Sequence, residues 1–277
     1  MNWFPLALLA AAGWGFGNVI GRAGVIRLKP HSMLIFYGIT LMAFYFVVWL
    51  FIGKPFTRTN YLFPLLSEGT GAIAFIFYYR AMELAPASVI VPVTSSYIII
   101  SVLIGVFLFH NPISSKQILA ISLIFAGIIF LMFPETRFKK GRWLIFAGLA
   151  TLFWGIWGGF TEMSVRYLWP MNLNLFFTFI AIPIWLPYFF IKGGFKTGKP
   201  EVKGIVLSAL SAVVSASGSV CFYFSVLKSH VSLAIPVANM YPLISVLAGI
   251  IFLKERPKPL QYAGIPFVIA GLFLIGG

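Results

Sequence analysis

A stretch that occurs twice decides the fold: SVIVPVTSSYIIISVLIGVFLFH at residues 88–110 and SLAIPVANMYPLISVLAGIIFLK at residues 232–254. A shift of 144 positions superimposes them with nine identities in 23 positions, more than apolar composition alone would give. The identical first-copy residues are Ser88, Pro92, Val93, Tyr97, Ile100, Ser101, Val102, Leu103 and Gly105. Each stretch is long enough to cross a bilayer as a helix. The chain therefore contains an internal repeat.

The repeat extends outward from these two stretches over the whole chain. The same shift aligns three further identical pairs, Tyr79 with Tyr223, Gln117 with Gln261 and Gly127 with Gly271. Earlier in each half the best shift is 140, which aligns Trp14 with Trp154 and Pro30 with Pro170. We therefore expect a first repeat at residues 1–136 and a second at residues 137–277.

The composition indicates that much of the protein surface faces lipid rather than water. The 277 residues are 60% hydrophobic and 9% charged, with a mean hydropathy of +0.98. Soluble domains carry about 25% charged residues, so too few charges are present to cover a water-facing surface. A membrane-spanning helix needs about 20 apolar residues. Runs of this kind predict spans at 3–22, 33–53, 61–82, 87–109, 115–133, 143–164, 172–192, 203–227, 232–253 and 259–276.

The number of spans per repeat has a geometric consequence. Five spans is an odd number, so two directly joined copies enter the membrane with opposite orientations. The predicted fold is an all-α integral membrane protein of about ten transmembrane helices in two inverted five-helix repeats. Substrate sites in inverted-repeat transporters lie near the bilayer midplane between the repeats, which predicts a transporter with a central cavity.

Charge and cysteine usage exclude several classes. The net charge of +14 comes from 20 Lys and Arg against 6 Glu, but the basic residues lie between apolar runs, where they contact lipid headgroups and set topology. We therefore expect no nucleic-acid partner. One cysteine, Cys221, and three widely spaced histidines predict no metal, and no cofactor is expected. The expected location is the cell membrane, as a multi-pass protein.

The same basic residues predict an orientation. The loops on the side of the N-terminus carry five, namely Lys54, Arg58, Lys116, Arg166 and Lys228. The opposite loops carry thirteen, namely Arg27, Lys29, Arg137, Lys139, Lys140, Arg142, Lys192, Lys196, Lys199, Lys203, Lys254, Arg256 and Lys258. Because cytoplasmic loops are enriched in Lys and Arg, the count predicts that both termini lie outside.

Several motifs resemble one family. They are the Trp- and Gly-rich first span of each half, residues 85–92 with their partner 231–236, the Leu-Lys-Glu-Arg-Pro sequence at 253–257, and the final Gly264…Gly271 span. In this order and doubled, they resemble the EamA-type members of the drug/metabolite transporter superfamily over essentially the whole chain. The resemblance implies two inverted five-helix repeats, a solute carrier that often exports amino acids or other metabolites, and both termini inside. Where the family has an acidic residue at the end of the fourth helix, Glu255 matches but Asn111 does not.

Four ionisable residues are candidates because charges within spans are costly and are usually functional. Glu68 lies inside the third span, where burial disfavours the charged carboxylate, and it is a candidate for proton coupling or a contact with a substrate amine. Glu162 and Arg166 are four residues apart and can pair on one helix face. Arg22 is the repeat mate of Glu162, so these three are gate or ion-pair candidates; a structural role remains open for each.

Aromatic and small polar residues are the candidates for substrate contact. They lie in the first, third and fourth spans of each half, and a proline in the fourth spans frees backbone groups that are tolerated beside a cavity. Their stacking faces and uncharged hydrogen-bonding groups suit an amphipathic or zwitterionic solute, although aromatic residues also pack or face lipid. The candidates are Trp14, Asn18, Tyr78, Tyr79, Thr94, Ser95, Tyr97, Trp154, Tyr223, Asn239 and Tyr241.

These residues predict a secondary active transporter that works by alternating access rather than an enzyme. The sequence carries no phosphate-binding loop and no nucleophile with a base and an orienting acid, so the energy would come from a gradient. The alternatives are a membrane enzyme acting on a lipid-linked substrate and a facilitative channel or uniporter. The expected partners are a small-molecule solute and membrane lipids, with proton coupling through Glu68. Export is the expected direction, and both a monomer and a homodimer remain open, as does the identity of the solute.

Overall fold

The computed structural model describes most of the chain. The described residues are 2–25, 27–82, 84, 90, 93–131, 141–194, 200–241, 243–244 and 259–276, without the side chains of Arg22, Val25, Met82, Leu131, Leu260, Gln261 and Gly276. The predictions for Pro92, Glu255 and the loop at 132–140 lie outside these residues.

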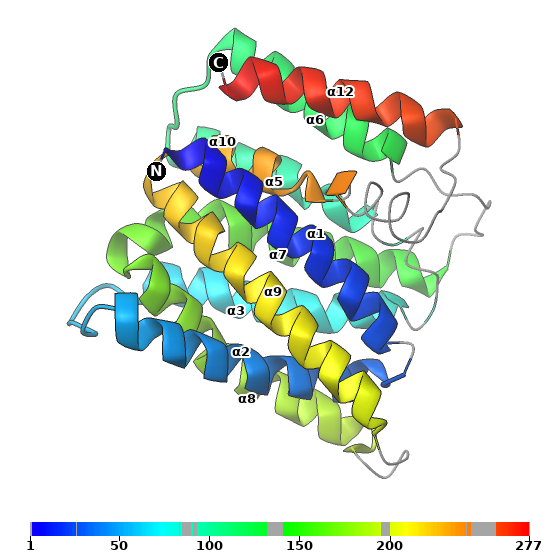
Figure 1. Cartoon of the computed structure of the whole chain (residues 1–277). Helices are drawn as coiled ribbons and strands as arrows, with labels where there is room; N and C mark the ends of the chain where they lie inside the picture. The colour runs from blue at the N-terminus through cyan, green and yellow to red at the C-terminus, as the bar shows by residue number, and fades with distance from the viewer. Residues whose placement is uncertain are drawn as a thin grey trace.

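All described secondary structure is helical (Figure 1). The elements are α1 (Trp3–Val25), α2 (Pro30–Ile52), α3 (Leu62–Met82), α5 (Tyr97–Leu103), the π-helical turn η1 (Ile104–Leu108), α6 (Ser115–Leu131), α7 (Arg142–Tyr167), α8 (Pro170–Ile191), α9 (Val202–Leu227), α10 (Val231–Ala238) and α12 (Pro259–Gly276).

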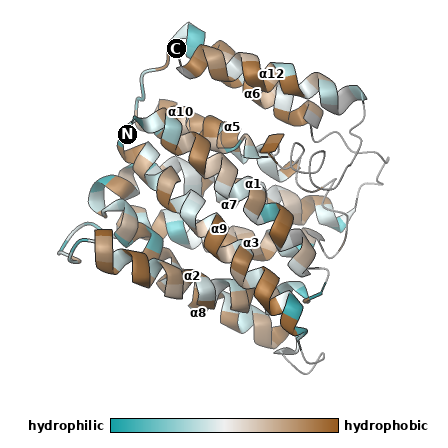
Figure 2. Cartoon of the chain, in the orientation of Figure 1, coloured by the Kyte–Doolittle hydropathy of each residue, from teal (hydrophilic) through white to brown (hydrophobic). Residues whose placement is uncertain are grey.

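The helices have the length and the apolar composition of membrane-spanning segments. Six of them in the described parts of the chain, α1, α2, α3, α7, α8 and α9, are long and apolar enough to cross a membrane, and shorter apolar helices lie at 93–108, 115–130 and 262–275. Large apolar side chains point outward, with Phe51 83% and Phe273 79% exposed, and hydrophobic residues, with hydrophilic ones interspersed, lie along the labelled helices (Figure 2). The interior is instead rich in alanine, glycine and serine, as in membrane bundles. The protein is an all-α, multi-pass membrane protein.

Helix starts follow the prolines. Pro30 and Pro170 each occupy the first turn of a helix, α2 and α8, where the missing N–H of proline costs nothing. The predicted spans 33–53 and 172–192 therefore begin two or three residues too late. At the other end, α1 runs to Val25 and α7 to Tyr167, each three residues beyond the prediction.

Two predicted spans are not simple helices. The span predicted at 87–109 ends in η1, where Phe109 N–H donates to the Ile104 carbonyl at 3.3 Å across five residues. The span predicted at 232–253 begins as α10, which stops after Ala238 in a turn at Asn239 and Met240. Pro236 lies inside α10 and removes one backbone donor. A continuous helix was therefore the wrong prediction for residues 232–241.

The helices pair across the sequence (Figure 1). Extensive contacts join α1 to α9, α3 to α7, α2 to α8 and α6 to α12. Each pair takes one helix from residues 1–136 and one from residues 137–277. When each helix is exchanged for the one at the shifted position, α1 for α7 and α3 for α9, the set of pairs is unchanged. Both termini lie at the same end of the bundle.

Individual hydrogen bonds show the same symmetry between the two halves. Ser67 Oγ donates to the Trp157 carbonyl at 2.9 Å, and Ser211 Oγ donates to the Gly17 carbonyl at 2.7 Å. Ser211 is 144 positions after Ser67, and Trp157 is 140 positions after Gly17. The two serines thus fasten the third helix of one half to the first helix of the other half, twice over.

Candidate functional site

Eight aromatic side chains form a cluster where α1, α3, α5, α7 and α9 meet. Ring centroids are 5.1 Å apart for Trp14 and Phe222, 6.4 Å for Trp14 and Trp157, and 5.6 Å for Trp157 and Phe222. Trp154 lies 5.0 Å from Tyr78. We call this set the aromatic cluster; its members are Trp14, Phe75, Tyr78, Tyr97, Trp154, Trp157, Phe222 and Tyr223.

The cluster unites five of the predicted residues through three that were not predicted. Tyr97 reaches both Trp154 and Trp157, with centroids 6.0 and 6.2 Å apart. Trp157 therefore links the two ends of the cluster, yet the prediction omitted it, together with Phe75 and Phe222. The repeat could have pointed to Phe222, because it lies 144 positions after Tyr78. Trp157 aligns with Gly17, which gives no such signal.

Glu68 is fully buried and lies beside the aromatic cluster, against Tyr223. The Tyr223 hydroxyl lies 3.0 and 2.9 Å from its two carboxylate oxygens, and Ser67 Oγ, which donates to the Trp157 carbonyl, lies 3.3 Å from one of them. Trp157 Nε1 in turn donates to the Tyr223 hydroxyl at 3.3 Å. Among the described side chains, Glu68 forms no ion pair. The carboxyl group is thus connected to the aromatic cluster through the Tyr223 hydroxyl.

The side-chain amide of Asn239 is not satisfied by hydrogen bonds from the described residues. It is fully buried, and neither its amide nitrogen nor its side-chain oxygen has a hydrogen-bond partner among the described residues. It follows directly after α10, where the helix stops. A buried amide without partners is costly, and Asn239 has both a donor and an acceptor that the described residues leave unpaired.

The predicted residues at and just before the start of α5 are buried. Thr94, Ser95 and Tyr97 are buried, and Thr94 Oγ1 donates to the Ile90 carbonyl at 3.1 Å. Ser95 Oγ lies 3.5 Å from the Tyr241 hydroxyl, which joins the start of α5 to the chain after α10. Ser95 and Asn239 are repeat mates at the shift of 144, so both halves place a small polar residue at this level.

Asn18 lies elsewhere, and Tyr79 lies at the edge of the cluster. Asn18 is exposed on α1, although it lies one turn from Trp14. The Tyr79 ring centroid is 5.4 Å from that of Tyr78 and 6.5 Å from that of Phe75, and Tyr79 also packs in the neighbouring apolar core with Leu34 and Trp185. Helix spacing gives only the approximate face of a residue, so it did not show that Asn18 lies outside the cluster.

Glu162 and Arg166 pair as predicted, with Arg166 Nη2 donating to Glu162 Oε1 at 2.9 Å. Glu162 is buried, and Asn111 Nδ2 also donates to it at 2.7 Å. The backbone of Arg22 lies near the end of α1 that is far from the termini, whereas Glu162 lies near the opposite end of the bundle, beside Val231. The side chain of Arg22 lies outside the described part of the structure.

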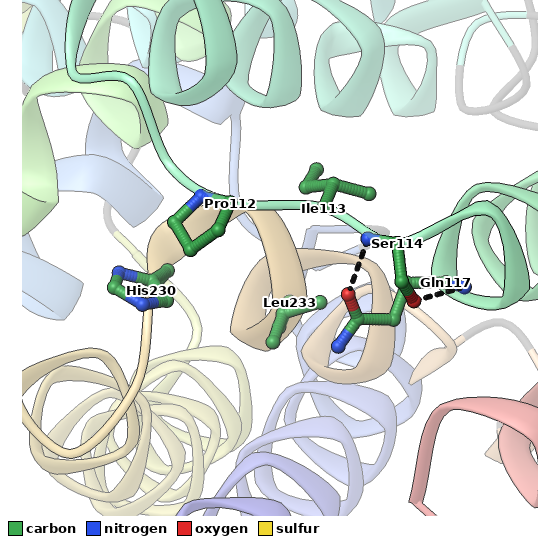
Figure 3. Close-up of a pocket in the computed structure, with 6 residues that line it drawn as sticks. All are labelled: Pro112, Ile113, Ser114, Gln117, His230 and Leu233. Atoms are coloured by element: carbon green, nitrogen blue, oxygen red, sulfur yellow. Dashed lines mark hydrogen bonds between the residues drawn. The ribbon is translucent and has the colours of Figure 1, made fainter.

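Two cavities lie near this end of the bundle. One of about 630 Å³ is lined by Pro112, Ile113, Ser114, Gln117, His230 and Leu233 (Figure 3). A second, of about 380 Å³, lies beside it and is lined by residues of α5, η1 and α6 together with Asn111 and Ile113. Both are mainly apolar and neither includes a member of the aromatic cluster.

The central arrangement offers stacking faces, hydroxyl groups, one unsatisfied amide and one carboxyl group. No lysine or arginine appears among the buried side chains that the structure describes. The described groups can hold a small organic molecule by stacking and hydrogen bonding, but they provide no cation for a phosphate or an isolated carboxylate.

Comparisons with known proteins agree with a transporter. The chain is 24% identical to a "Putative sugar uptake protein" of Listeria monocytogenes over 98% of this chain and 97% of that protein. It is 22% identical to a "Probable amino-acid metabolite efflux pump" of Escherichia coli K12 over 97% of this chain and 93% of that protein. A solved crystal structure matches with a TM-score of 0.81 at 14% identity, covering 99% of this chain and 98% of its own, which shows a shared fold.

The match to a family model covers nearly the whole sequence, in two parts. The model of the EamA-like transporter family matches residues 1–133 and again residues 141–277. With the relatives named above, this match assigns the protein to the transporters rather than to the enzymes. The chain belongs to the EamA-like transporter family.

Proposed function

We propose that this protein is a secondary carrier of a small organic solute that works by alternating access between two inverted five-helix repeats. The observation that supports it best is the aromatic cluster, which takes side chains from α1, α3 and α5 of the first half and from α7 and α9 of the second. A solute held there contacts both halves, so a movement of one half against the other changes the side from which it is reached.

The exchange symmetry of the contacts supports the inverted repeats, residues 1–136 and 137–277. Gly15 leaves room for Ile244 and Gly155 leaves room for Ile100, each with the added Cβ position within 2.8 Å of the isoleucine Cβ. Likewise Gly127 packs on Val268 and Gly271 packs on Ile124. Two halves of the same topology that make the same contacts in both directions are related by a two-fold axis. With α5 and η1 as one span and α10 as the start of another, each half has five spans.

The proposed solute contacts are the aromatic cluster, Ser95, Tyr241 and Asn239. Trp14 Nε1 is already bonded to Ser219 Oγ at 3.0 Å, so Trp14 offers its ring face rather than its donor. Asn239 offers both a donor and an acceptor. This set fits an uncharged or zwitterionic molecule with an apolar part, such as an amino acid or a sugar.

Proton coupling through Glu68 is the second part of the proposal. Burial disfavours the charged carboxylate, whereas the Tyr223 hydroxyl stabilises it. Two opposing influences of this kind allow the group to bind a proton in one state of the carrier and release it in another. The relatives include an uptake protein and an efflux pump, so flux is measured in both directions.

The test begins with ligand binding. Purified protein is melted in the presence of a panel of amino acids, sugars and nucleosides; a hit raises the melting temperature, and we expect the rise to disappear in Trp14→Ala and Asn239→Ala but to persist in Asn18→Ala. The hit is then assayed in proteoliposomes. Saturable flux that accumulates solute against its gradient when a pH gradient is imposed, and that no longer accumulates in Glu68→Gln, supports a coupled carrier. Non-saturable flux would identify a channel and overturn the proposal.

A further inference from the structure

Glu162 is the centre of a second buried polar cluster, distinct from the aromatic cluster. Its carboxylate accepts hydrogen bonds from Asn111 Nδ2 at 2.7 Å, Arg166 Nη2 at 2.9 Å and the backbone N–H of Val231 at 3.2 Å. His230 Nδ1 lies 3.5 Å from the same group. We call these residues the Glu162 node. It connects α7, the loop before α6 and the first turn of α10.

The backbone around Asn111 is shaped to reach this node. The chain leaves α5 through the π-helical turn η1, and His110 follows with φ of +54°, a conformation that costs energy for a residue with a side chain. Asn111 N–H then donates back to the Gly105 carbonyl at 3.0 Å, and its side chain donates to Glu162 and, at 3.2 Å, to Ser232 Oγ. π-Turns and strained residues concentrate at functional sites, and here both serve to aim a single amide.

The node joins the two halves. Asn111 belongs to residues 1–136, whereas Glu162, Arg166, His230 and Val231 belong to residues 137–277. If the halves move apart at this end, the Asn111 hydrogen bonds to Glu162 and Ser232 must break. A buried carboxylate that loses a donor is costly until water replaces it, so the intact node holds this end of the bundle closed.

An open surface cavity borders the node. The cavity of about 630 Å³ is lined by Pro112 to Ser114 and Gln117 on one side and by His230 and Leu233 on the other (Figure 3). The His230 side chain is 35% exposed and also lies against Glu162, so it stands between the cavity and the node. The cavity lies at the bundle end that carries both termini.

We propose that the Glu162 node is the gate of the carrier at the end that carries the termini, with this cavity as its outer vestibule. The gate opens when Asn111, with its loop, parts from Glu162 and Ser232. Solute then passes from the vestibule along α10 to Asn239. The inference rests on the proposed alternating-access function, but its test does not require the solute.

The experiment measures access to Asn239. Cys221 is the single cysteine of the chain, so Cys221→Ser with Asn239→Cys carries one reporter thiol at a fully buried position. Its reaction with a membrane-impermeant maleimide is timed in proteoliposomes. We expect Glu162→Gln to raise the labelling rate about tenfold, the population change that corresponds to the loss of one charge-assisted hydrogen bond. Glu201→Gln is the matched control, because Glu201 forms a solvent-exposed ion pair with Arg27 at the other end of the bundle.

A second variant of the node keeps the labelling test decisive if Glu162→Gln misfolds. Asn111→Ala removes the contribution of the first half and leaves the Glu162–Arg166 pair in place. Where Glu162→Gln does not give a single monodisperse species, the same rise in labelling is expected from Asn111→Ala. Equal labelling rates in the parent, the Glu201→Gln control and a folded node variant would overturn the gate.

The two proposals fail in different ways. A node variant that labels at the parent rate while the protein carries out saturable solute flux removes the gate and leaves the carrier. A variant that labels faster in a protein that shows no saturable flux for its ligand keeps the node as a closure of this end and removes the carrier.

Discussion

Tyr223 is the residue on which the state of Glu68 depends most directly. Its hydroxyl lies within 3.0 Å of both carboxylate oxygens, and Glu68 is fully buried. We expect Tyr223→Phe to lower the stability of the purified protein by about 1–3 kcal/mol, because a buried acceptor loses its donor. Tyr79→Phe is the control: Tyr79 is the repeat mate of Tyr223, and its hydroxyl forms no hydrogen bond with the residues that the structure describes. Thermal melts in detergent measure both; equal melting temperatures for the two variants would contradict the assigned role of Tyr223.

At the residue scale, charge is easier to interpret in sequence than aromaticity. Glu68 and Glu162 could be identified as candidate functional residues from the sequence, because a carboxylate within an apolar span is costly unless it is paired or has a function. Trp157 could not, because 18% of the chain is aromatic and nothing local distinguishes a ring in the cluster from one that faces lipid; Phe222 could be found only through its repeat mate Tyr78. Among the partners of Glu162, Arg166 could be predicted from its helical spacing, whereas Asn111 and His230 lie 51 and 68 positions away.

At the scale of elements, glycine positions set how closely the helices approach. A Cβ added to Gly155 of α7 would lie 2.5 Å from Ile100 Cβ on α5, whereas a Cβ added to Gly148 of the same helix meets nothing within 4 Å. We expect Gly155→Ala to lower stability by about 1–3 kcal/mol through overpacking and Gly148→Ala to leave it unchanged or slightly raised. Chemical denaturation or thermal melting of the two variants gives the comparison, and a Gly155→Ala protein as stable as Gly148→Ala would show that α5 and α7 do not pack this closely.

Length and hydropathy predicted the elements that are continuous helices and missed those that are not. α1, α2, α3, α7, α8 and α9 follow from apolar runs bounded by proline or charge, with ends displaced by at most three residues. The π-turn after α5 and the stop after Ala238 do not follow, because hydropathy measures composition and is insensitive to which carbonyl each N–H contacts. These interruptions adjoin Asn111 and Asn239, the two amides that carry the proposals above.

At the scale of the whole molecule, the helix pairs are symmetric with respect to the repeat. The pairing of α1 with α9 becomes the pairing of α7 with α3 when the halves are exchanged, although the repeat alone did not predict that these helices meet. The repeat does not say which end faces the cytoplasm, since an inverted pair looks alike from both sides. Only the distribution of charge breaks this equivalence.

Charge distribution then gives the last prediction, the orientation of the bundle. The predicted loops on the side of the N-terminus carry five Lys and Arg, and the predicted loops on the opposite side carry thirteen. Arg27 of one such opposite loop pairs with Glu201 of another at 2.8 Å, so these loops do meet at one end. Because loops rich in Lys and Arg stay in the cytoplasm, we expect a C-terminal alkaline phosphatase fusion to be active and a GFP fusion at the same site to be dark. A bright GFP fusion without phosphatase activity would place both termini inside, as the family resemblance implies, and would put the Glu162 node and its vestibule on the cytoplasmic face.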